Sequence, residues 1–192
     1  MPRPAIATAT QMLNSAGHLF YWQGVRATSV PEITALSGIS PAGLYRLYDS
    51  KEDLFLAYVE HAADRSQEWF LVATSENNGS PRSRILALFD QALRRMRSVE
   101  GRGCPILLTM SEFPDSNSPA YRRAIAYKRW LRDQLGELTA ELSDQVRIPH
   151  PEALADQLLL IIDGMYVSTQ VFGPEGPPSQ AKAIIERLIP KS

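Results

Sequence analysis

The 192-residue sequence predicts an all-α protein of about nine helices. Apolar residues recur at the three- and four-residue spacing of amphipathic helices through most of the chain. Segments rich in proline, glycine or small polar residues separate these runs, at 77–81, 101–103, 114–119 and 173–178. No stretch shows the alternating pattern of a strand, and no internal repeat or low-complexity tract is present. The length is ample for a hydrophobic core, in one compact unit or two small domains.

Residues 24–54 hold the most informative pattern, two short helices that meet at a tight turn. Ser29 can cap the first short helix, because Glu32 stands at the reciprocal position of a capping box. Gly38 can end that helix, since glycine enters left-handed backbone space without steric cost. Ser40 can then cap the second short helix, and Pro41 directly after it occupies the first helical position, which proline prefers. Two short helices joined by a glycine-containing turn predict a helix-turn-helix.

The same stretch resembles the DNA-binding domain of the tetracycline-repressor (TetR) family of bacterial transcriptional regulators. The specific resemblance covers roughly residues 5–60, and beyond them it is one of layout. The chain departs from the family pattern at Leu47 and Tyr48, where the family often has His and Phe, and at Ala42, where it often has glycine. The matched positions are Gly24, Val25, Thr28, Ser29, Val30, Glu32, Ile33, Ser37, Gly38, Ile39, Ser40, Leu44, Tyr45, Ser50, Lys51, Glu52, Asp53 and Leu54.

The resemblance implies an N-terminal three-helix DNA-binding domain, residues 1–50, and a C-terminal helical domain for effector binding and dimerisation, residues 51–192. We place the boundary inside a long connecting helix at 51–77 rather than in a flexible linker. The first helix is predicted at 4–22, before the helix-turn-helix. The later helices are predicted at 82–98, 104–113, 119–145, 152–172 and 179–189.

Ten residues are predicted to contact DNA. Thr28 and Ser29 lie at a helix N-terminus and can donate hydrogen bonds to phosphate. Arg46 is the only long basic side chain of the second short helix, so it is the best candidate for pairing with a guanine. Lys51 is expected to contact a phosphate, with a solvated surface charge as the alternative. The exposed side of the recognition helix is expected to carry Pro41, Ala42, Gly43, Tyr45 and Arg46. Ser40 and Tyr48 complete the set.

A small-molecule pocket is predicted among the later helices, lined by aromatic and sulfur-containing side chains. For each of these residues, plain core packing is the alternative. Asp163 interrupts an apolar helix, so its carboxylate must meet either a structural partner or a ligand. Cys104 begins a helix and is either a sensor thiol or, as we favour, an inert buried one. The predicted lining is Trp69, Phe89, Met96, Met110, Phe113, Tyr127, Trp130, Asp163 and Tyr166.

The helix at 152–172 is apolar on most sides, more than a peripheral helix of a small monomer would be. Together with 179–189 it predicts a homodimer interface built as a four-helix bundle, two helices from each copy. The expected contacts are Ala155, Leu159, Ile162, Tyr166 and Ile185. A row of arginines on the helix at 82–98 could be a second nucleic-acid patch, but we favour a solvated face or ion pairs with neighbouring acids.

Charge and composition add limits. The net charge is −1 and the pI about 6.3, which does not by itself indicate nucleic acid. Residues 1–51 carry four basic and two acidic side chains, whereas residues 133–192 carry four basic and nine acidic ones. A single cysteine fits a reducing cytoplasm. The apolar run at 158–172 is interrupted by polar residues, and no signal segment is visible, so a cytoplasmic protein without a membrane segment is expected.

The predicted function is a ligand-responsive repressor that binds palindromic operator DNA as a homodimer and is released by a small, apolar or aromatic effector. One alternative is a DNA-binding dimer without an effector. The other is a helical enzyme, which the sequence does not favour, because its three histidines share no motif and no phosphate loop or catalytic triad is present. No cofactor or metal is expected.

Overall fold

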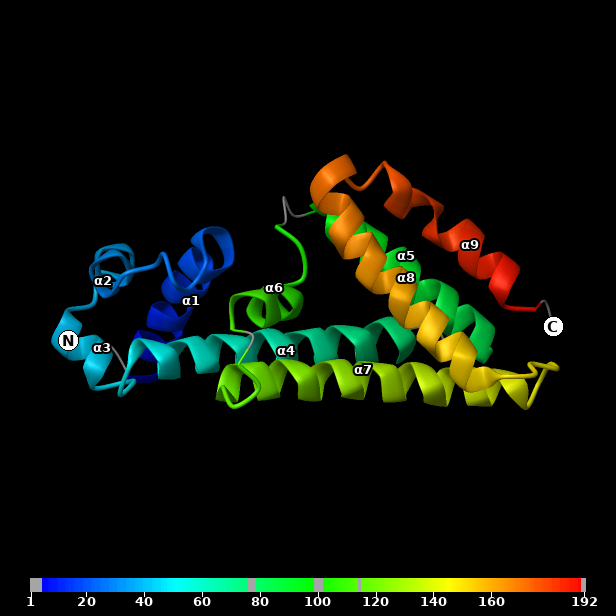
Figure 1. Cartoon of the computed structure of the whole chain (residues 1–192), viewed down its shortest axis with the longest axis horizontal. Coiled ribbons are helices and arrows are strands. Elements are labelled where there is room, and N and C mark those ends of the chain that lie inside the picture. Colours follow the sequence, from blue (N-terminus) through cyan, green and yellow to red (C-terminus); the bar gives the residue numbers. More distant parts are fainter. Residues whose placement is uncertain (1–4, 76–78, 99–101, 114, 191–192) are drawn as a thin grey trace. The chain divides into compact units, whose positions relative to one another are not determined.

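A computed structural model describes residues 5–75, 79–98, 102–113 and 115–190, and every regular element in these ranges is helical (Figure 1). The predicted all-α fold class is thereby confirmed. The α-helices are α1 (Ala5–Gln23), α2 (Val30–Ser37), α3 (Pro41–Tyr45), α4 (Lys51–Ser75), α5 (Pro81–Ser98), α6 (Pro105–Glu112), α7 (Pro119–Ser143), α8 (Pro151–Phe172) and α9 (Ala181–Leu188). A short 3₁₀ helix at Pro177–Gln180 precedes α9.

Five of these helices, α3, α5, α6, α7 and α8, begin at a proline, and α5, α6 and α7 do so at or just after turn segments found in the sequence. Proline is tolerated at the first helical position because its missing N–H has no intrahelical acceptor there. The predicted stop of the long connecting helix is partly outside the described residues, since 76–78 are not among them. The helix itself ends at Ser75.

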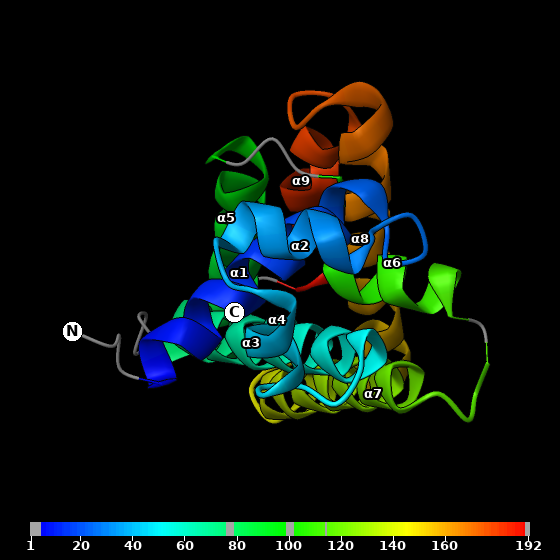
Figure 2. The ribbon, with the colours of Figure 1, turned by 90° about the vertical axis from the view of Figure 1, so that its left-hand side faces the viewer.

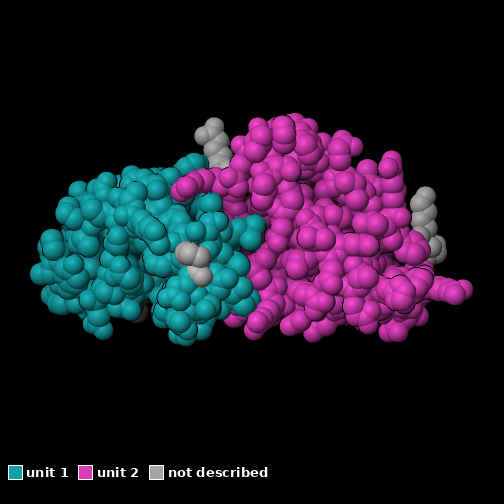
Figure 3. All heavy atoms as spheres, viewed as in Figure 1, with its two compact units in different colours: residues 1–64, 105–125 teal, residues 65–104, 126–192 magenta. Residues whose placement is uncertain are grey.

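The chain divides into two compact units (Figure 3). Unit 1 contains Met1–Asp64 and Pro105–Ile125, and unit 2 contains Arg65–Cys104 and Ala126–Ser192. Helices α4 and α7 therefore each continue from one unit into the other. The sequence analysis divided the chain by function, into a DNA-binding domain at 1–50 and an effector-binding and dimerisation domain at 51–192. That division is not one of packing, and it stays a prediction.

In unit 1, α1 packs against α2 and α2 packs against α3 (Figure 2, blue). Gln11 of α1 donates a hydrogen bond to the carbonyl of Ser37 at the end of α2, at 2.6 Å. Phe20 and Phe55 meet edge to face with ring centroids 5.3 Å apart, which fixes α1 on α4. The apolar core of this unit includes Met12, Ala16, Phe20, Ile33, Leu44, Leu54, Phe55 and Val59.

In unit 2, α5, α8 and α9 pack on one another. Trp130 of α7 lies edge to face on Phe70 of α4, with ring centroids 5.4 Å apart. Buried leucines on one side of α7 continue this core at the spacing of an amphipathic helix. Among the described residues, none of the helices combines the length and the hydropathy needed to span a bilayer.

Candidate nucleic-acid interface

The N-terminus of α2 is built by the predicted capping box. Ser29 has an extended backbone, and its Oγ accepts from the N–H of Glu32 at 3.4 Å. Glu32 Oε2 in turn accepts from the Ser29 N–H at 2.7 Å and from its hydroxyl at 2.6 Å. The hydrogen bond from the Ser29 hydroxyl, and to a lesser extent the one from the Ser29 N–H, hold the pKa of Glu32 below its ordinary value. The Ser29 hydroxyl therefore donates inside the box, and a phosphate would have to compete for it.

The turn between α2 and α3 is the one the sequence predicts. Gly38 has φ +66°, in the left-handed region, and its N–H donates to the carbonyl of Thr34 at 2.9 Å. Ser40 then caps α3, its Oγ accepting from the N–H of Gly43 at 3.2 Å. The helix-turn-helix is thus specified by hydrogen bonds that span only two to four residues.

The exposed side of α3 carries Pro41, Ala42, Tyr45 and Arg46, as predicted. Gly43 corrects that prediction, because it is buried rather than exposed. A Cβ atom added at Gly43 would lie 2.6 Å from Cγ2 of Ile39, so the glycine allows α3 to pack closely on the preceding turn.

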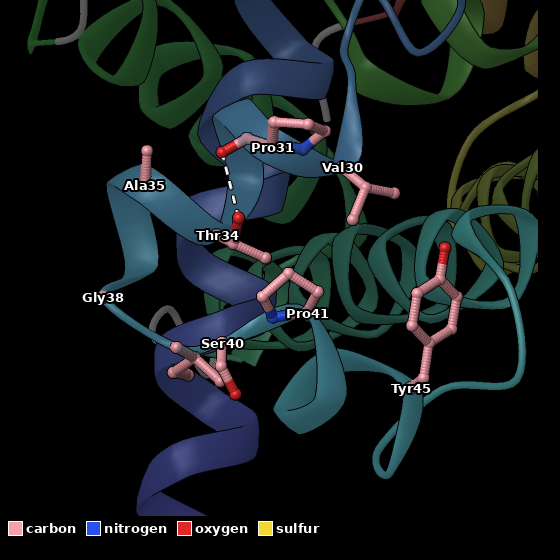
Figure 4. A pocket seen from close by; sticks show the side chains of 9 residues that line it. Val30, Pro31, Thr34, Ala35, Gly38, Ser40, Pro41 and Tyr45 are labelled. Atoms are coloured by element: carbon pink, nitrogen blue, oxygen red, sulfur yellow. Dashed lines mark hydrogen bonds between the residues drawn. The ribbon is translucent and has the colours of Figure 1, made fainter.

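An open groove of about 620 Å³ runs between α2 and α3. Figure 4 shows the Tyr45 ring on one side of it and the proline rings of residues 31 and 41 on the other. Thr34 lies within it and donates its hydroxyl to the carbonyl of Pro31 at 3.0 Å. The groove lining is mostly apolar, so it can make van der Waals contacts rather than charge interactions. Its lining is Val30, Pro31, Thr34, Ala35, Gly38, Ile39, Ser40, Pro41 and Tyr45.

Thr28 and Lys51 are engaged inside the protein. Thr28 is only 1% exposed, and its hydroxyl donates to the carbonyl of Gly24 at 2.8 Å. This corrects the expectation that the Thr28 hydroxyl is available to a phosphate. Lys51 is half-buried, and its Nζ donates to the carbonyls of Val25 and Thr28 at 3.0 Å each. An ammonium group has three N–H donors, and these two carbonyls use two of them. The phosphate contact of Lys51 stays a prediction, and only the third N–H is available for it.

The turn between α1 and α2 also receives a contact that the sequence did not suggest. Glu112, the last residue of α6, accepts a hydrogen bond from the N–H of Val25 at 2.7 Å. Phe113 stacks on Phe55 with ring centroids 5.1 Å apart, and the Arg26 guanidinium lies 5.9 Å from the Phe113 ring centroid. No periodicity or motif signals a contact between residues 87 positions apart.

The residues predicted to line a ligand pocket are divided between the two units. Met110 and Phe113 belong to unit 1, and the other seven belong to unit 2. Within unit 2, Tyr127 stacks on Trp130 with centroids 6.0 Å apart, and Phe89 is almost fully buried. Burial, and then the proximity of Cys104 and Tyr166, raise the pKa of Tyr127 far above its ordinary value. These contacts are typical of core packing, which was the alternative to ligand binding for each of these residues. Their contact with a ligand stays a prediction.

Several of these polar groups have partners within unit 2. Asp163 forms an ion pair with Lys128, so a structural partner satisfies the carboxylate in the apolar helix. The Trp69 ring centroid lies 5.6 Å from the Arg95 guanidinium. The Sδ of Met96 accepts a hydrogen bond from Thr169 at 3.4 Å.

Arginines of α5 also meet partners, as the favoured interpretation of that row expected. Arg84 pairs with Glu141, and Arg97 makes two hydrogen bonds to Glu175, at 2.6 and 2.9 Å.

The predicted dimer contacts need a correction. Ala155, Ile162 and Ile185 are at most 2% exposed within the single chain, so their side chains belong to the core of unit 2. Leu159 and Tyr166 are partly exposed. The large apolar side chains that these helices expose are Leu160, Val167, Val171 and Phe172 of α8, and Ile184 and Leu188 of α9. Because α8 is apolar on most sides, its sequence pattern did not distinguish the inward face from the outward one.

A second pocket, of about 320 Å³, lies between α7 and α8. Its lining includes Arg132, which makes two hydrogen bonds to Asp156, at 2.6 and 3.1 Å. These bonds raise the pKa of Arg132 and lower that of Asp156. The sequence analysis did not predict this pocket, since its residues come from two separate helices and share no motif. Among the described residues, no group of three or more histidine, cysteine or acidic side chains could hold a metal ion.

A helix-turn-helix with an exposed arginine and tyrosine on its second helix defines the class of DNA-binding regulators. Comparison with known proteins makes the class more specific. The family model described as "Bacterial regulatory proteins, tetR family" matches residues 12–58. The chain is 27% identical over 145 residues to the HTH-type transcriptional regulator BetI of Rhizobium meliloti (strain 1021), which covers 76% of this chain and 69% of that protein.

Solved structures extend the similarity over almost the whole chain. A TetR-family transcriptional regulator from Streptomyces coelicolor matches with a TM-score of 0.88 and 26% identity, covering 95% of each chain. NemR of E. coli in its reduced form shares the fold, with a TM-score of 0.84 and 20% identity over 96% of this chain and 99% of that one. The family model, the relative and the solved structures all support the TetR family of bacterial transcriptional regulators, which confirms the resemblance found in the sequence.

Proposed function

We propose that this regulator is a cytoplasmic repressor that binds a palindromic operator as a homodimer and is released by a small apolar or aromatic molecule. The observation that carries the proposal is the exposed face of α3, where Tyr45 lines the apolar groove and the next residue, Arg46, is exposed. An arginine there can make a bidentate contact to guanine, while the tyrosine and the groove can meet a thymine methyl group.

The dimer is supported by apolar side chains that the single chain leaves in water. Leu160, Val167 and Val171 of α8 are 72%, 53% and 69% exposed. They follow one another at seven and four residues, with the exposed Gly164 between the first two, so they share one face of the helix. A second copy of the chain would cover this face by an isologous contact. A two-fold dimer then presents two recognition helices to half-sites about 34–36 Å apart.

Release by an effector is supported by the aromatic and sulfur-containing side chains of unit 2, among them Trp69, Met96 and Tyr127. Binding there would shift the population between a conformation that fits DNA and one that does not. The DNA-binding dimer without an effector remains the second candidate, since Tyr127 and Trp130 already stack on each other and Asp163 already has a partner. Quenching of tryptophan fluorescence by aromatic compounds that also release operator DNA would favour the first candidate. Release by none of them would favour the second.

The experiment that tests DNA recognition is a selection from a random DNA library with the purified protein. We expect a palindromic consensus, and an Arg46→Ala variant should lose about 1–3 kcal/mol of binding free energy and relax specificity at one base pair. Arg129→Ala is the matched control, because it removes the same charge from an exposed position of α7. Absence of any enriched sequence at low salt would overturn the proposal.

A further inference from the structure

The turn between α1 and α2 is held by two charged side chains that come from distant parts of the chain. The ammonium of Lys51, the first residue of α4, donates to the carbonyls of Val25 and Thr28 at 3.0 Å. The carboxylate of Glu112, the last residue of α6, accepts from the N–H of Val25 at 2.7 Å. Both polar groups of Val25 are thus held, one by a cation and the other by an anion. The turn, Lys51 and Glu112 all belong to unit 1.

The backbone is shaped to admit the carboxylate. Gly24 is buried and has φ +90°, a conformation that side chains disfavour. A Cβ atom at this position would lie 2.7 Å from Oε1 and 3.0 Å from Oε2 of Glu112. Gly24 therefore provides both the backbone conformation and the space that the Glu112 carboxylate occupies. The stacking of Phe113 on Phe55 anchors the residue that follows it.

The position of this turn fixes the start of α2. The Thr28 hydroxyl donates a hydrogen bond to the carbonyl of Gly24, and the next residue, Ser29, is the N-cap of α2. A helix N-terminus is a natural site for a DNA phosphate. A shift of the turn would therefore displace the end of α2 that is predicted to lie on the DNA backbone.

We propose that Glu112 is a positioning residue for DNA binding, acting with Lys51 as a clamp on the Val25 peptide. This inference rests on the proposed function. A movement that lengthens the Glu112 contact from 2.7 Å to beyond about 3.5 Å removes the hydrogen bond.

The test compares operator affinity for Glu112→Ala, Glu112→Gln and the matched control Glu60→Ala, an exposed carboxylate of α4. Removal of a negative charge near DNA, with no positioning role, strengthens binding or leaves it unchanged, and Glu60→Ala should do so. Glu112→Ala should instead weaken binding about tenfold, because it removes a charge-assisted hydrogen bond. Glu112→Gln keeps an acceptor, so it should lie between the wild type and Glu112→Ala.

Two further readouts separate positioning from phosphate contact and from unfolding. The salt dependence of binding should keep its slope in Glu112→Ala, since no phosphate contact is lost. Amide hydrogen exchange in the segment 24–29 should become faster, while exchange in unit 2 stays unchanged. If Glu112→Ala does not fold, Glu112→Gln with its smaller loss of affinity decides the question.

The outcomes distinguish this proposal from the function on which it rests. If the wild type binds a selected operator and both Glu112 variants bind it equally well or more tightly, the clamp is overturned and the regulator stands. If the wild type selects no operator, the proposed function itself fails. A loss of affinity shared equally by Glu60→Ala would also overturn the clamp, because it would be an effect of charge alone.

Discussion

At the scale of single residues, the helix-turn-helix depends on short hydrogen bonds between a few polar groups. Ser29 and Glu32 satisfy each other and the first N–H groups of α2, and Ser40 does the same for α3. Gly38 supplies the left-handed backbone between them. Gly43 has a different task, since its missing side chain leaves room for Ile39. Each of these residues can be tested alone, because its partners lie within four positions.

The capping box should make the stability of unit 1 depend on pH. The folded-state pKa of Glu32 is lowered, so its contribution is present above its ordinary pKa of 4.5 and is lost as the pH falls through the folded-state value. We expect Glu32→Gln to lower the free energy of unfolding at neutral pH and to reduce the loss of stability as the pH falls below 4.5. Urea unfolding at a series of pH values measures this. Glu52→Gln, an exposed glutamate in the first turn of α4, is the control. Parallel pH profiles of Glu32→Gln and the wild type would contradict the assignment.

At the scale of elements, α8 shows how one helix serves two surfaces. Its inward face, with Ala155, Leu158 and Ile162, packs in the core of unit 2. Its outward face carries Leu160, Val167 and Val171, and the position between the first two on this face is the exposed Gly164. A helix that is apolar on both faces needs a cover for each. The second cover is the proposed partner copy.

Val167→Lys should separate the dimer, because two lysines would meet near the two-fold axis of an apolar interface. We expect a monomer by analytical ultracentrifugation, and operator affinity at least about a hundredfold lower, since the two half-sites are then no longer bound together. Val72→Lys is the matched control, a valine of α4 with 49% exposure against 53% for Val167. If Val167→Lys stays dimeric, the interface lies elsewhere on the chain.

At the scale of the whole molecule, charge limits how the protein holds DNA. The chain is nearly neutral, and residues 1–51 carry a net charge of only +2. In the described part of α5, Arg84 and Arg97 are paired with acids, and Lys51 is engaged by carbonyls. Affinity must then depend on two copies and on helix N-termini rather than on a large basic surface.

We therefore expect a shallow salt dependence for operator binding. Two exposed arginines in each copy, Arg26 and Arg46, give about four cationic contacts per dimer, hence a slope of log affinity against log salt of about −4. Fluorescence anisotropy with an operator duplex between about 50 and 200 mM salt measures this slope. A slope near −10 would contradict the prediction and would point to a second basic surface, for which the arginines of α5 would be tested next. Arg129→Ala should leave the slope unchanged.

The sequence by itself determined the fold class, the helix-turn-helix and the family. Caps, glycine stops and the 3.6-residue period act over two to four positions, so the local sequence specifies them. Tertiary structure decided what the local sequence left open. Burial of Thr28 and Gly43, the outward face of α8, the pairing of Asp163 with Lys128 and the contact of Glu112 with Val25 all join residues or surfaces that the chain brings together only on folding. Such contacts depend on how the helices pack, and an apolar or charged side chain carries no local signal of which distant partner it will meet.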